Sequence, residues 1–314
     1  MTFHFQQAVR AVILLAFSGM LFMLHFSGDI TKLINPKYVG LSQSASIIFL
    51  FLFFIQITRI WTDTGKSHHH CHDDHACGHD HGDSSFNAKK LISYAVIVVP
   101  ILTGFFLPAK VLDASIANKK GGMAVLSHQN QNPQEKKDSS DSKTATSEDL
   151  SQSAEDNISV KDDVIDPGLA SREEVSKEKY DQLIKKLQQS PKIKMNDYVY
   201  AAYYEEISKD IKKFKGRKIE LKGFVYKEDG FGPNQLVISR FLITHCVADA
   251  SIIGFLSEIP DASSLKEDTW IEATGILDVT TYNGTELPTI KITDLKKTSE
   301  PKEPYLYPIN VKLL

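Results

Sequence analysis

Residues 38–57 read YVGLSQSASIIFLFLFFIQI, and this stretch decides the class of the fold. It carries no charged side chain, and from Ile47 to Ile55 it consists of Phe, Ile and Leu alone. An α-helix rises about 1.5 Å per residue, so about 20 residues cross a hydrocarbon core of roughly 30 Å. The length fits, and we predict a membrane-spanning helix here.

Two further apolar runs flank this stretch, at Ala8–Phe26 and Leu91–Leu107. The first is longer than the apolar part of a typical signal peptide and no small-residue cleavage site follows it, which favours an uncleaved helix. The second contains Pro100 and Gly104, which membrane helices tolerate where neighbouring helices satisfy the backbone. We therefore predict about three transmembrane helices within residues 1–112.

Basic residues near the ends of these runs do not fix the orientation, because each side of the membrane receives five. The Ser- and Thr-rich segment after the third run suits an extracytoplasmic setting. We expect a multi-pass membrane protein, surrounded by lipid, with the N-terminus inside and the C-terminal domain extracytoplasmic.

The loop 67–83, between the second and third runs, reads SHHHCHDDHACGHDHGD. It holds seven of the eleven histidines and two of the three cysteines. Imidazole and thiolate are the ligands that zinc prefers, usually four in a tetrahedron, and nearby carboxylates can join them or orient the imidazoles. The predicted zinc ligands are His68, His69, His70, Cys71, His72, Asp73, His75, Cys77, His79 and His81. Other divalent transition metals also bind imidazole, so the metal itself stays open.

Composition changes after the third run. Residues 127–168 carry ten acidic and four basic side chains and almost no aromatic ones, which is typical of a disordered segment. We predict an acidic, Ser-rich linker at 113–170 and a folded domain at 171–314.

The C-terminal domain is predicted to begin with two helices, at 173–189 and 197–214, the second capped by Asp197. Five alternating stretches then follow, at 218–226, 235–241, 251–258, 269–279 and 288–295, with Asn283-Gly284 as a hairpin turn. Five short strands favour a small closed barrel of the OB type. The predicted class is therefore α+β, with transmembrane helices followed by helices and an OB-like β-barrel.

One polar cluster interrupts this domain between the second and third strands, where residues 240–249 read RFLITHCVAD. A functional interpretation makes Arg240, His245, Cys246 and Asp249 a ligand site, or an Arg240–Asp249 pair that shapes a pocket. A structural interpretation makes Asp249 a turn cap and Cys246 a space-filling residue. One His and one Cys cannot complete a zinc site alone.

Several function classes have little support. No Ser-His-Asp spacing, phosphate-binding loop or HExxH motif is present, so we expect no enzyme. The net charge is -3 and basic and aromatic residues are scattered, so we expect no nucleic-acid binding.

The hydrophobic spans and the His-Asp-Cys loop precede a specific run of residues in the C-terminal domain. That run comprises Asn234, Gln235, Arg240, Phe241, His245, Cys246, Val247, Ala248, Asp249, Gly254, Trp270, Gly275, Pro288 and Pro304 to Tyr307. The combination resembles the YcgQ family of bacterial membrane proteins over most of the chain except the acidic linker.

The resemblance implies a subunit in the plasma membrane of a bacterium that pairs with a multi-span permease and is linked to zinc homeostasis. We therefore expect an accessory subunit of a permease whose His-rich loop binds a divalent metal. The alternative is a membrane-anchored binding protein whose OB-like domain recognises an extracytoplasmic ligand or polymer.

Overall fold

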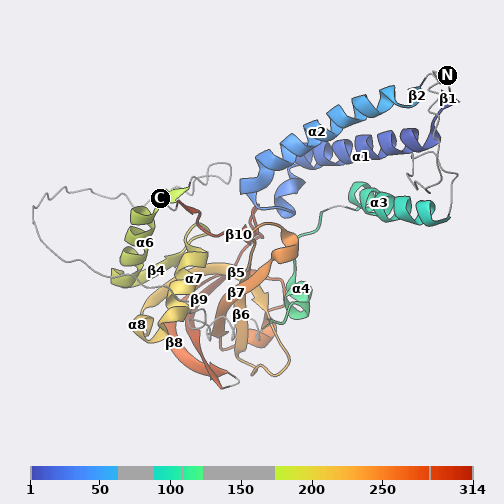
Figure 1. Ribbon diagram of the computed structural model, residues 1–314. Coiled ribbons are helices and arrows are strands. Elements are labelled where there is room, and N and C mark those ends of the chain that lie inside the picture. Colours follow the sequence, from blue (N-terminus) through green and yellow to red (C-terminus); the bar gives the residue numbers. More distant parts are fainter. Residues whose placement is uncertain (1, 63–87, 108, 123–173, 283, 313–314) are drawn as a thin grey trace, which may run out of the picture. The chain divides into compact units, whose positions relative to one another are not determined.

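The computed structural model describes residues 2–62, 88–107, 109–122, 174–282 and 284–312. Contacts divide the chain into two compact units, one of Met1–Val111 with Ile243–Ala250 and one of Leu112–Leu242 with Ser251–Leu314 (Figure 1). The predicted metal loop at 67–83 and most of the predicted acidic linker lie outside the described residues.

Three helices form most of the first unit: α1 at Phe5–Ser27, α2 at Val39–Thr58 and α3 at Ala88–Phe106. All three predicted apolar runs are therefore confirmed as helices. A two-residue strand, β1 at Thr2–Phe3, pairs with β2 at Trp61–Thr62, so the start of α1 lies beside the end of α2.

Polar side chains connect α1 and α2 at three levels. Ser18 and Ser46 each donate a hydroxyl to the other's carbonyl oxygen, at 3.0 and 3.2 Å. The other two contacts are His25 Nε2 with Ser42 Oγ at 3.2 Å, and Gln56 with Gln7. Because residue numbers rise along α1 as they fall along α2, the two helices are antiparallel. Buried polar groups that find partners across helices help to fix such a pair.

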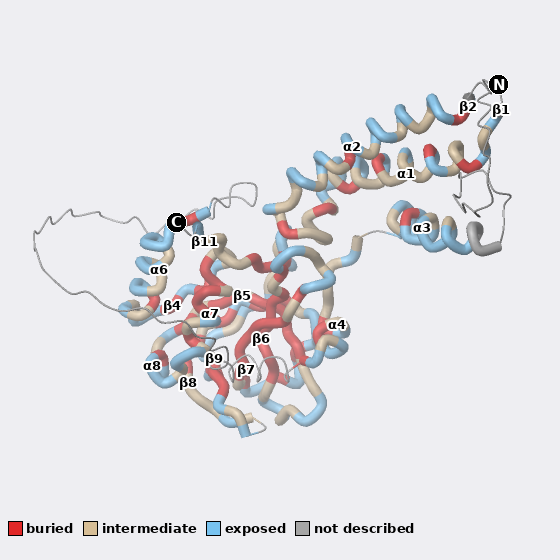
Figure 2. The backbone as a smooth tube through the Cα atoms, in the orientation of Figure 1, coloured by how far each residue is buried: buried red, intermediate tan, exposed pale blue. Residues whose placement is uncertain are grey.

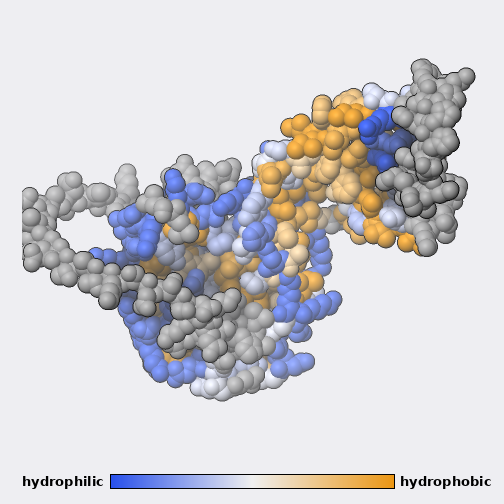
Figure 3. Space-filling view, viewed as in Figure 1, coloured by the Kyte–Doolittle hydropathy of each residue, from blue (hydrophilic) through white to orange (hydrophobic). Residues whose placement is uncertain are grey.

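The helices present an apolar surface. Phe5–Ser27 and Pro36–Thr58 are long and apolar enough to cross a membrane, whereas the apolar part of α3, Ile92–Phe106, is shorter. Figure 3 shows this surface in orange over α1 and α2. Among the described residues, every exposed large apolar side chain except Ile276 precedes the second unit. Exposed apolar area of this extent marks a surface that lipid or another protein covers.

The connector, residues 28–38, joins α1 to α2. It starts at Gly28, whose φ of 79° ends α1 in the left-handed region that glycine adopts without strain. Two short 3-10 helices follow, η1 at Asp29–Lys32 and η2 at Pro36–Tyr38. Asn35 lies between them, and its side-chain oxygen accepts a hydrogen bond from the N–H of Lys37 at 3.0 Å. The connector is thus a defined turn.

A seven-stranded sheet dominates the second unit, with the order β10-β6-β7-β9-β8-β5-β4 and a further pairing between β6 and β5. Its strands are β4 Lys192–Met195, β5 Lys218–Tyr226, β6 Gln235–Leu242, β7 Ser251–Glu258, β8 Trp270–Tyr282, β9 Thr285–Lys297 and β10 Tyr305–Leu306. The pairings β5–β6, β6–β7, β7–β9, β9–β8 and β8–β5 therefore follow one another in a circuit.

The core lies around the strands of this circuit. Figure 2 shows β6 and β7 as largely buried segments, and Val237, Ile238 and Phe255 have no more than 1 % of their surface exposed. A Cβ at Gly254 on β7 would overlap the carbonyl oxygen of Ile238 on β6, so glycine permits the close approach of these strands.

Shorter elements complete the second unit. They are α4 Ala114–Lys119, β3 Val175–Ser176, α6 Lys177–Gln189, α7 Tyr200–Lys209, α8 Ile211–Phe214, η5 Ala262–Ser264 and β11 Val311–Lys312. β11 pairs with β3 in parallel. α7 contacts both β7 and β9, and the ring of Tyr204 meets that of Phe255 at 5.3 Å between centroids.

The five predicted strands are confirmed, with ends within a few residues of those observed. The second predicted helix is wrong in two respects. It is divided into α7 and α8, and Asp197 does not cap it: Asn196 accepts the N–H of Val199 instead. Asp197 has a different partner, Arg240, because a fully buried guanidinium requires a carboxylate more strongly than a helix end does.

Candidate functional site

The predicted cluster at 240–249 falls into two parts, since Arg240 belongs to the second unit and residues 243–250 to the first. Arg240 lies in β6 and is 0 % exposed. Its Nη1 donates to Asp197 Oδ1 at 2.5 Å, and its Nε donates to the carbonyl oxygen of Pro304 at 3.2 Å. The predicted Arg240–Asp249 pair is therefore wrong, because the guanidinium points to Asp197.

Further contacts hold the same guanidinium. It lies over the ring of Trp270, 5.1 Å from the centroid, and Nη1 also approaches the carbonyl oxygen of Lys222 at 3.5 Å. Nη2 has no hydrogen-bond partner in the described part of the chain. Arg240 thus joins β6 to β5, to β8, to the residues before α7 and to those before β10, which is a structural arrangement inside the second unit.

The docking loop, Ile243–Ala250, connects β6 to β7 and contacts the connector between α1 and α2. The N–H of Asn35 donates to the carbonyl oxygen of His245 at 2.9 Å, and the N–H of Val247 donates to that of Leu33 at 2.8 Å. Ile34 and Cys246 face each other as an antiparallel bridge between these two bonds. The contact is a short piece of β-ladder.

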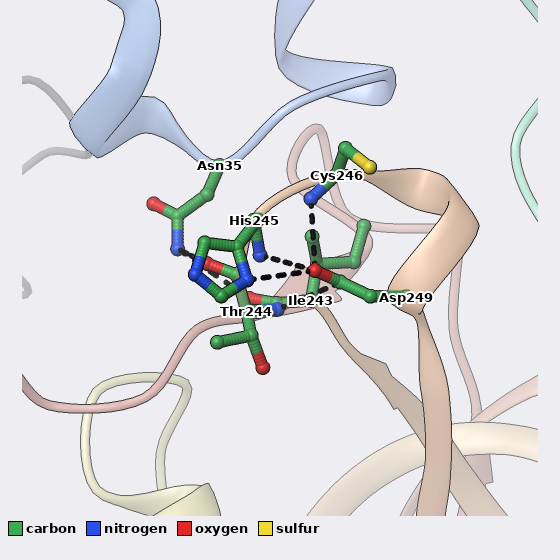
Figure 4. A network of polar contacts seen from close by, with 6 residues as sticks. All are labelled: Asn35, Ile243, Thr244, His245, Cys246 and Asp249. Atoms are coloured by element: carbon green, nitrogen blue, oxygen red, sulfur yellow. Dashed lines mark hydrogen bonds and ion pairs between the residues drawn. The ribbon is translucent and has the colours of Figure 1, made fainter.

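The side chain of Asn35 strengthens this ladder. It is 6 % exposed, and its Nδ2 donates to the carbonyl oxygens of Thr244 at 2.9 Å and Ile243 at 3.4 Å (Figure 4). Its Oδ1 is already used by Lys37 within the connector. A single buried amide therefore orders the connector and holds the docking loop, as buried polar groups must find partners on every side.

Asp249 orders the docking loop from within. Its Oδ1 accepts the N–H of Thr244 at 3.1 Å, and its Oδ2 accepts the N–H groups of His245 at 2.7 Å and Cys246 at 3.3 Å. Partial burial alone would raise the pKa of the carboxyl, but these backbone donors and the His245 ring lower the pKa below its usual value. The prediction that Asp249 caps a turn is confirmed.

His245 and Cys246 differ in their surroundings. Nδ1 of His245 lies 3.0 Å from Asp249 Oδ2, and the ring stacks on Tyr38 of the connector with 5.7 Å between centroids. The side chain is nevertheless 66 % exposed. Cys246 is a half-buried free thiol, and Figure 4 shows its sulfur turned away from the imidazole. The two side chains do not converge on a common ligand position.

The interactions at this site are mainly hydrogen bonds between the main chain of the connector and that of the docking loop. In the part of the chain that the structure describes, no group of three or more His, Cys, Asp or Glu side chains could hold a metal ion. The predicted ligands His68 to His81 fall outside the described residues and stay a prediction. Catalysis at Arg240, His245 or Cys246 has no geometric support here, and the absence of enzymatic activity likewise stays a prediction.

Sequence reasoning missed Asn35 and Tyr38, two connector residues whose side chains contact the docking loop. A signal for Asn35 was present: Asn before Pro36 is a common way to start a turn, because its side chain can accept a nearby N–H. Its second role requires residues 208 and 209 positions away, which local patterns do not report.

A second candidate position is an open groove of about 570 Å³ in the second unit. It is lined by Gly232, Pro233, Asn234, Gln235, Glu258, Ile259, Pro260, Lys291 and Ile292. The groove lies where β6 begins and β7 ends, beside the short parallel pairing of β7 with β9. Its lining mixes apolar and charged groups.

Comparison with known proteins covers nearly the whole chain. The family described as DUF1980 N-terminal domain matches residues 9–123, and that described as DUF1980 C-terminal domain matches residues 170–308. The UPF0703 protein YcgQ of Bacillus subtilis (strain 168) is 30% identical over 95% of this chain and 98% of its own length.

A second relative, from Streptococcus mutans serotype c, is 26% identical over 95% of this chain and 98% of its own. Its name describes a subunit of a two-component membrane permease complex. Among solved structures, OBody NL8 bound to hen egg-white lysozyme covers 27% of this chain at 13% identity, with a TM-score of 0.18 that is too low to support an argument. From the sequence matches, the chain belongs to the DUF1980 family that includes YcgQ.

Proposed function

We propose that this protein is the accessory subunit of a two-component membrane permease complex that handles a divalent metal, most simply zinc. The observation that carries the proposal is the antiparallel pair α1–α2, with its apolar exterior and its internal hydrogen bonds. The name of the Streptococcus mutans relative supports a permease partner. Since the described spans offer few polar groups, an ion pathway would have to come largely from that partner.

The metal part of the proposal comes from composition. Residues 67–83 follow β2 and precede α3 in the chain, and β2 itself pairs with β1 at the end of α2. Nine His and Cys side chains in this segment can supply several tetrahedral ligand sets for zinc. We assign the segment a role in binding or delivering metal at one membrane face.

We further propose that α3 crosses the membrane, because the chain has to return to the side on which the docking loop meets the connector. The docking loop contacts the connector, which is at the opposite end of α1 and α2 from β1 and β2. If α1 and α2 both cross, the chain must return between Thr62 and Ile243 to the side of the connector. Among the residues described between these two positions, α3 is the apolar helix that can do so, and its packing at Gly104 against Met20 of α1 supports this.

We therefore propose that the metal loop and the docking loop lie on opposite faces of the membrane. We assign the docking loop to the extracytoplasmic face. Single-cysteine variants test this assignment: with Cys246 alone, a membrane-impermeant maleimide should label intact cells, and with Cys77 alone it should label only after permeabilisation. Labelling of Cys77 in intact cells would reverse the orientation, and equal access of both would contradict α3 as a span.

We also propose that the second unit is an OB-like barrel. The circuit of five strands, with β7 and β9 parallel and the other pairs antiparallel, supports this fold. The groove near Gln235 and Lys291 favours the alternative function, a membrane-anchored protein that binds an extracytoplasmic ligand or polymer, because such barrels often bind ligands beside their loops.

Two measurements on the purified protein test the main proposal. Detergent extracts should yield a stable complex with a multi-span permease, and the complex should bind several zinc ions. Replacement of the seven histidines and two cysteines of 67–83 by Gln and Ser should remove most of that zinc, whereas replacement of the aspartates alone should remove little. Unchanged zinc stoichiometry would reject the metal assignment. A lone protein that binds glycans would favour the alternative.

A further inference from the structure

The docking loop has the construction of a preformed element. Three of its N–H groups are satisfied by Asp249 within the loop, so its shape does not depend on the connector. The loop also leaves and re-enters the sheet at a paired position, because Leu242 on β6 and Ser251 on β7 are register partners. β6 and β7 pair along all eight residues, from Gln235 with Glu258 to Leu242 with Ser251.

The connector is equally well ordered. Gly28 ends α1, Asn35 caps η2, and α2 follows Tyr38 directly. The polar contacts between α1 and α2 continue this order from the connector along the helices, beginning with His25 and Ser42.

Two complementary sets of hydrogen bonds meet where these elements touch. The backbone of Leu33 and Asn35 pairs with that of His245 and Val247, and the Asn35 amide adds two bonds to the loop. Such a contact depends on the backbone conformation of the loop, because it is made mostly by main-chain hydrogen bonds, as when a β-strand is added to a sheet edge. It is lost as a unit if either partner changes shape, because the bonds share one geometry.

We propose that the docking loop and the connector form a coupling contact, through which a change in the shape of the connector alters the docking loop and the reverse. Asn35 and Asp249 are its positioning residues, one on each side. Its use in a permease complex rests on the proposed function, but the contact itself does not. Coupling of this kind is reciprocal, so a change on either side must be measurable on the other.

A disulfide tests whether the contact exists in the membrane. Ile34 and Cys246 form a non-hydrogen-bonded antiparallel pair, with one backbone hydrogen bond on either side of it. In such a pair the two Cα atoms are closer than in a hydrogen-bonded pair. Such pairs have the Cα separation that a disulfide needs. In a full-length chain with Cys71 and Cys77 changed to Ser, I34C should form a disulfide with Cys246 under mild oxidation in native membranes.

The matched control is L33C in the same background. Leu33 has αR backbone angles at the end of η1, is not the bridge partner of Cys246, and bonds Val247 through its carbonyl oxygen, so a cysteine at Leu33 should not form the disulfide with Cys246. A disulfide with I34C and none with L33C supports the contact. No disulfide with I34C, or equal yields from the two variants, would overturn it.

Amide hydrogen exchange tests the coupling. Asp249→Ala removes the acceptor for three loop N–H groups and leaves the connector sequence intact. If the two sides are coupled, the N–H of Asn35, across the contact, should exchange about tenfold faster, as expected when ordinary hydrogen bonds are lost from the ordered state. Asn35→Ala should produce the reciprocal effect, faster exchange at Val247 by a similar factor.

Lys32→Ala is the control, because it removes a partly exposed ion pair with Asp29 within the connector, at a side chain that does not take part in the hydrogen bonds to the docking loop. It should leave exchange at Val247 unchanged. Faster exchange at Thr244 but not at Asn35 in the Asp249→Ala protein would reject the coupling. The exchange experiment uses the chain alone in lipid and the disulfide experiment needs no purified partner, so failure of either is distinct from failure to co-purify a permease.

Discussion

Arg240 and Asp249 belong to one short polar stretch of sequence, yet they have opposite environments. Arg240 is completely buried and its charge is balanced by Asp197, whereas Asp249 is about a third exposed and balanced by backbone N–H groups. The boundary between them is the end of β6. The comparison teaches that a polar cluster in sequence can hold a structural part and a recognition part, separated by the point where a strand ends.

The largest expected effect comes from Asp197→Ala. This change leaves the guanidinium of Arg240 buried and unpaired, which costs about 3 kcal/mol or more in unfolding free energy. We expect the second unit to unfold at a lower urea concentration. The fluorescence of Trp270 reports this unfolding in a full-length chain that carries Trp61→Phe. The docking-loop contact to the connector should persist, as measured by the disulfide between I34C and Cys246.

Arg240→Met should cost less than Asp197→Ala, about 1–2 kcal/mol. The carbonyl oxygens of Pro304 and Lys222 lose a donor, but no charge stays buried, because Asp197 is 31% exposed and water can reach it. The same urea titration compares the two variants. A larger loss in Arg240→Met would show that the contacts with Trp270 and the two carbonyls outweigh the ion pair.

The different success of sequence reasoning in these regions has a physical cause. The strand at 218–226 follows from alternation of apolar residues, that at 251–258 from a short apolar run, and the spans from apolar length, because all of these signals are local. The partner of Arg240 was not predictable in this way. Asp197 has the residue type of a helix cap and stands before an apolar-periodic segment, and only the sheet order brings it beside β6.

The candidate site shows the same limit. Asp249 could be predicted as a turn cap because its acceptor role involves residues three to five positions before it. Asn35 and Tyr38 could not be predicted as partners of the loop, since their contacts depend on which end of α1 and α2 meets residues 243–250. The zinc ligands at 67–83 remain a compositional prediction.

The smallest expected effect is an acid titration of the docking loop, which separates it from the Arg240 part of the cluster. The pKa of Asp249 is lowered in the folded chain, so its stabilising hydrogen bonds are present above its ordinary pKa of about 3.9 and are lost as the pH falls through the lower, folded value. The backbone amide resonances of His245 and Cys246 should therefore shift with a pH midpoint below about 3.9.

Asp249→Asn should abolish this step, and Asp261→Asn, a change outside the loop, should leave it intact. A midpoint at or above the ordinary value would mean that burial of the carboxylate outweighs its three N–H donors, and the loop would then be ordered by the connector instead of by Asp249.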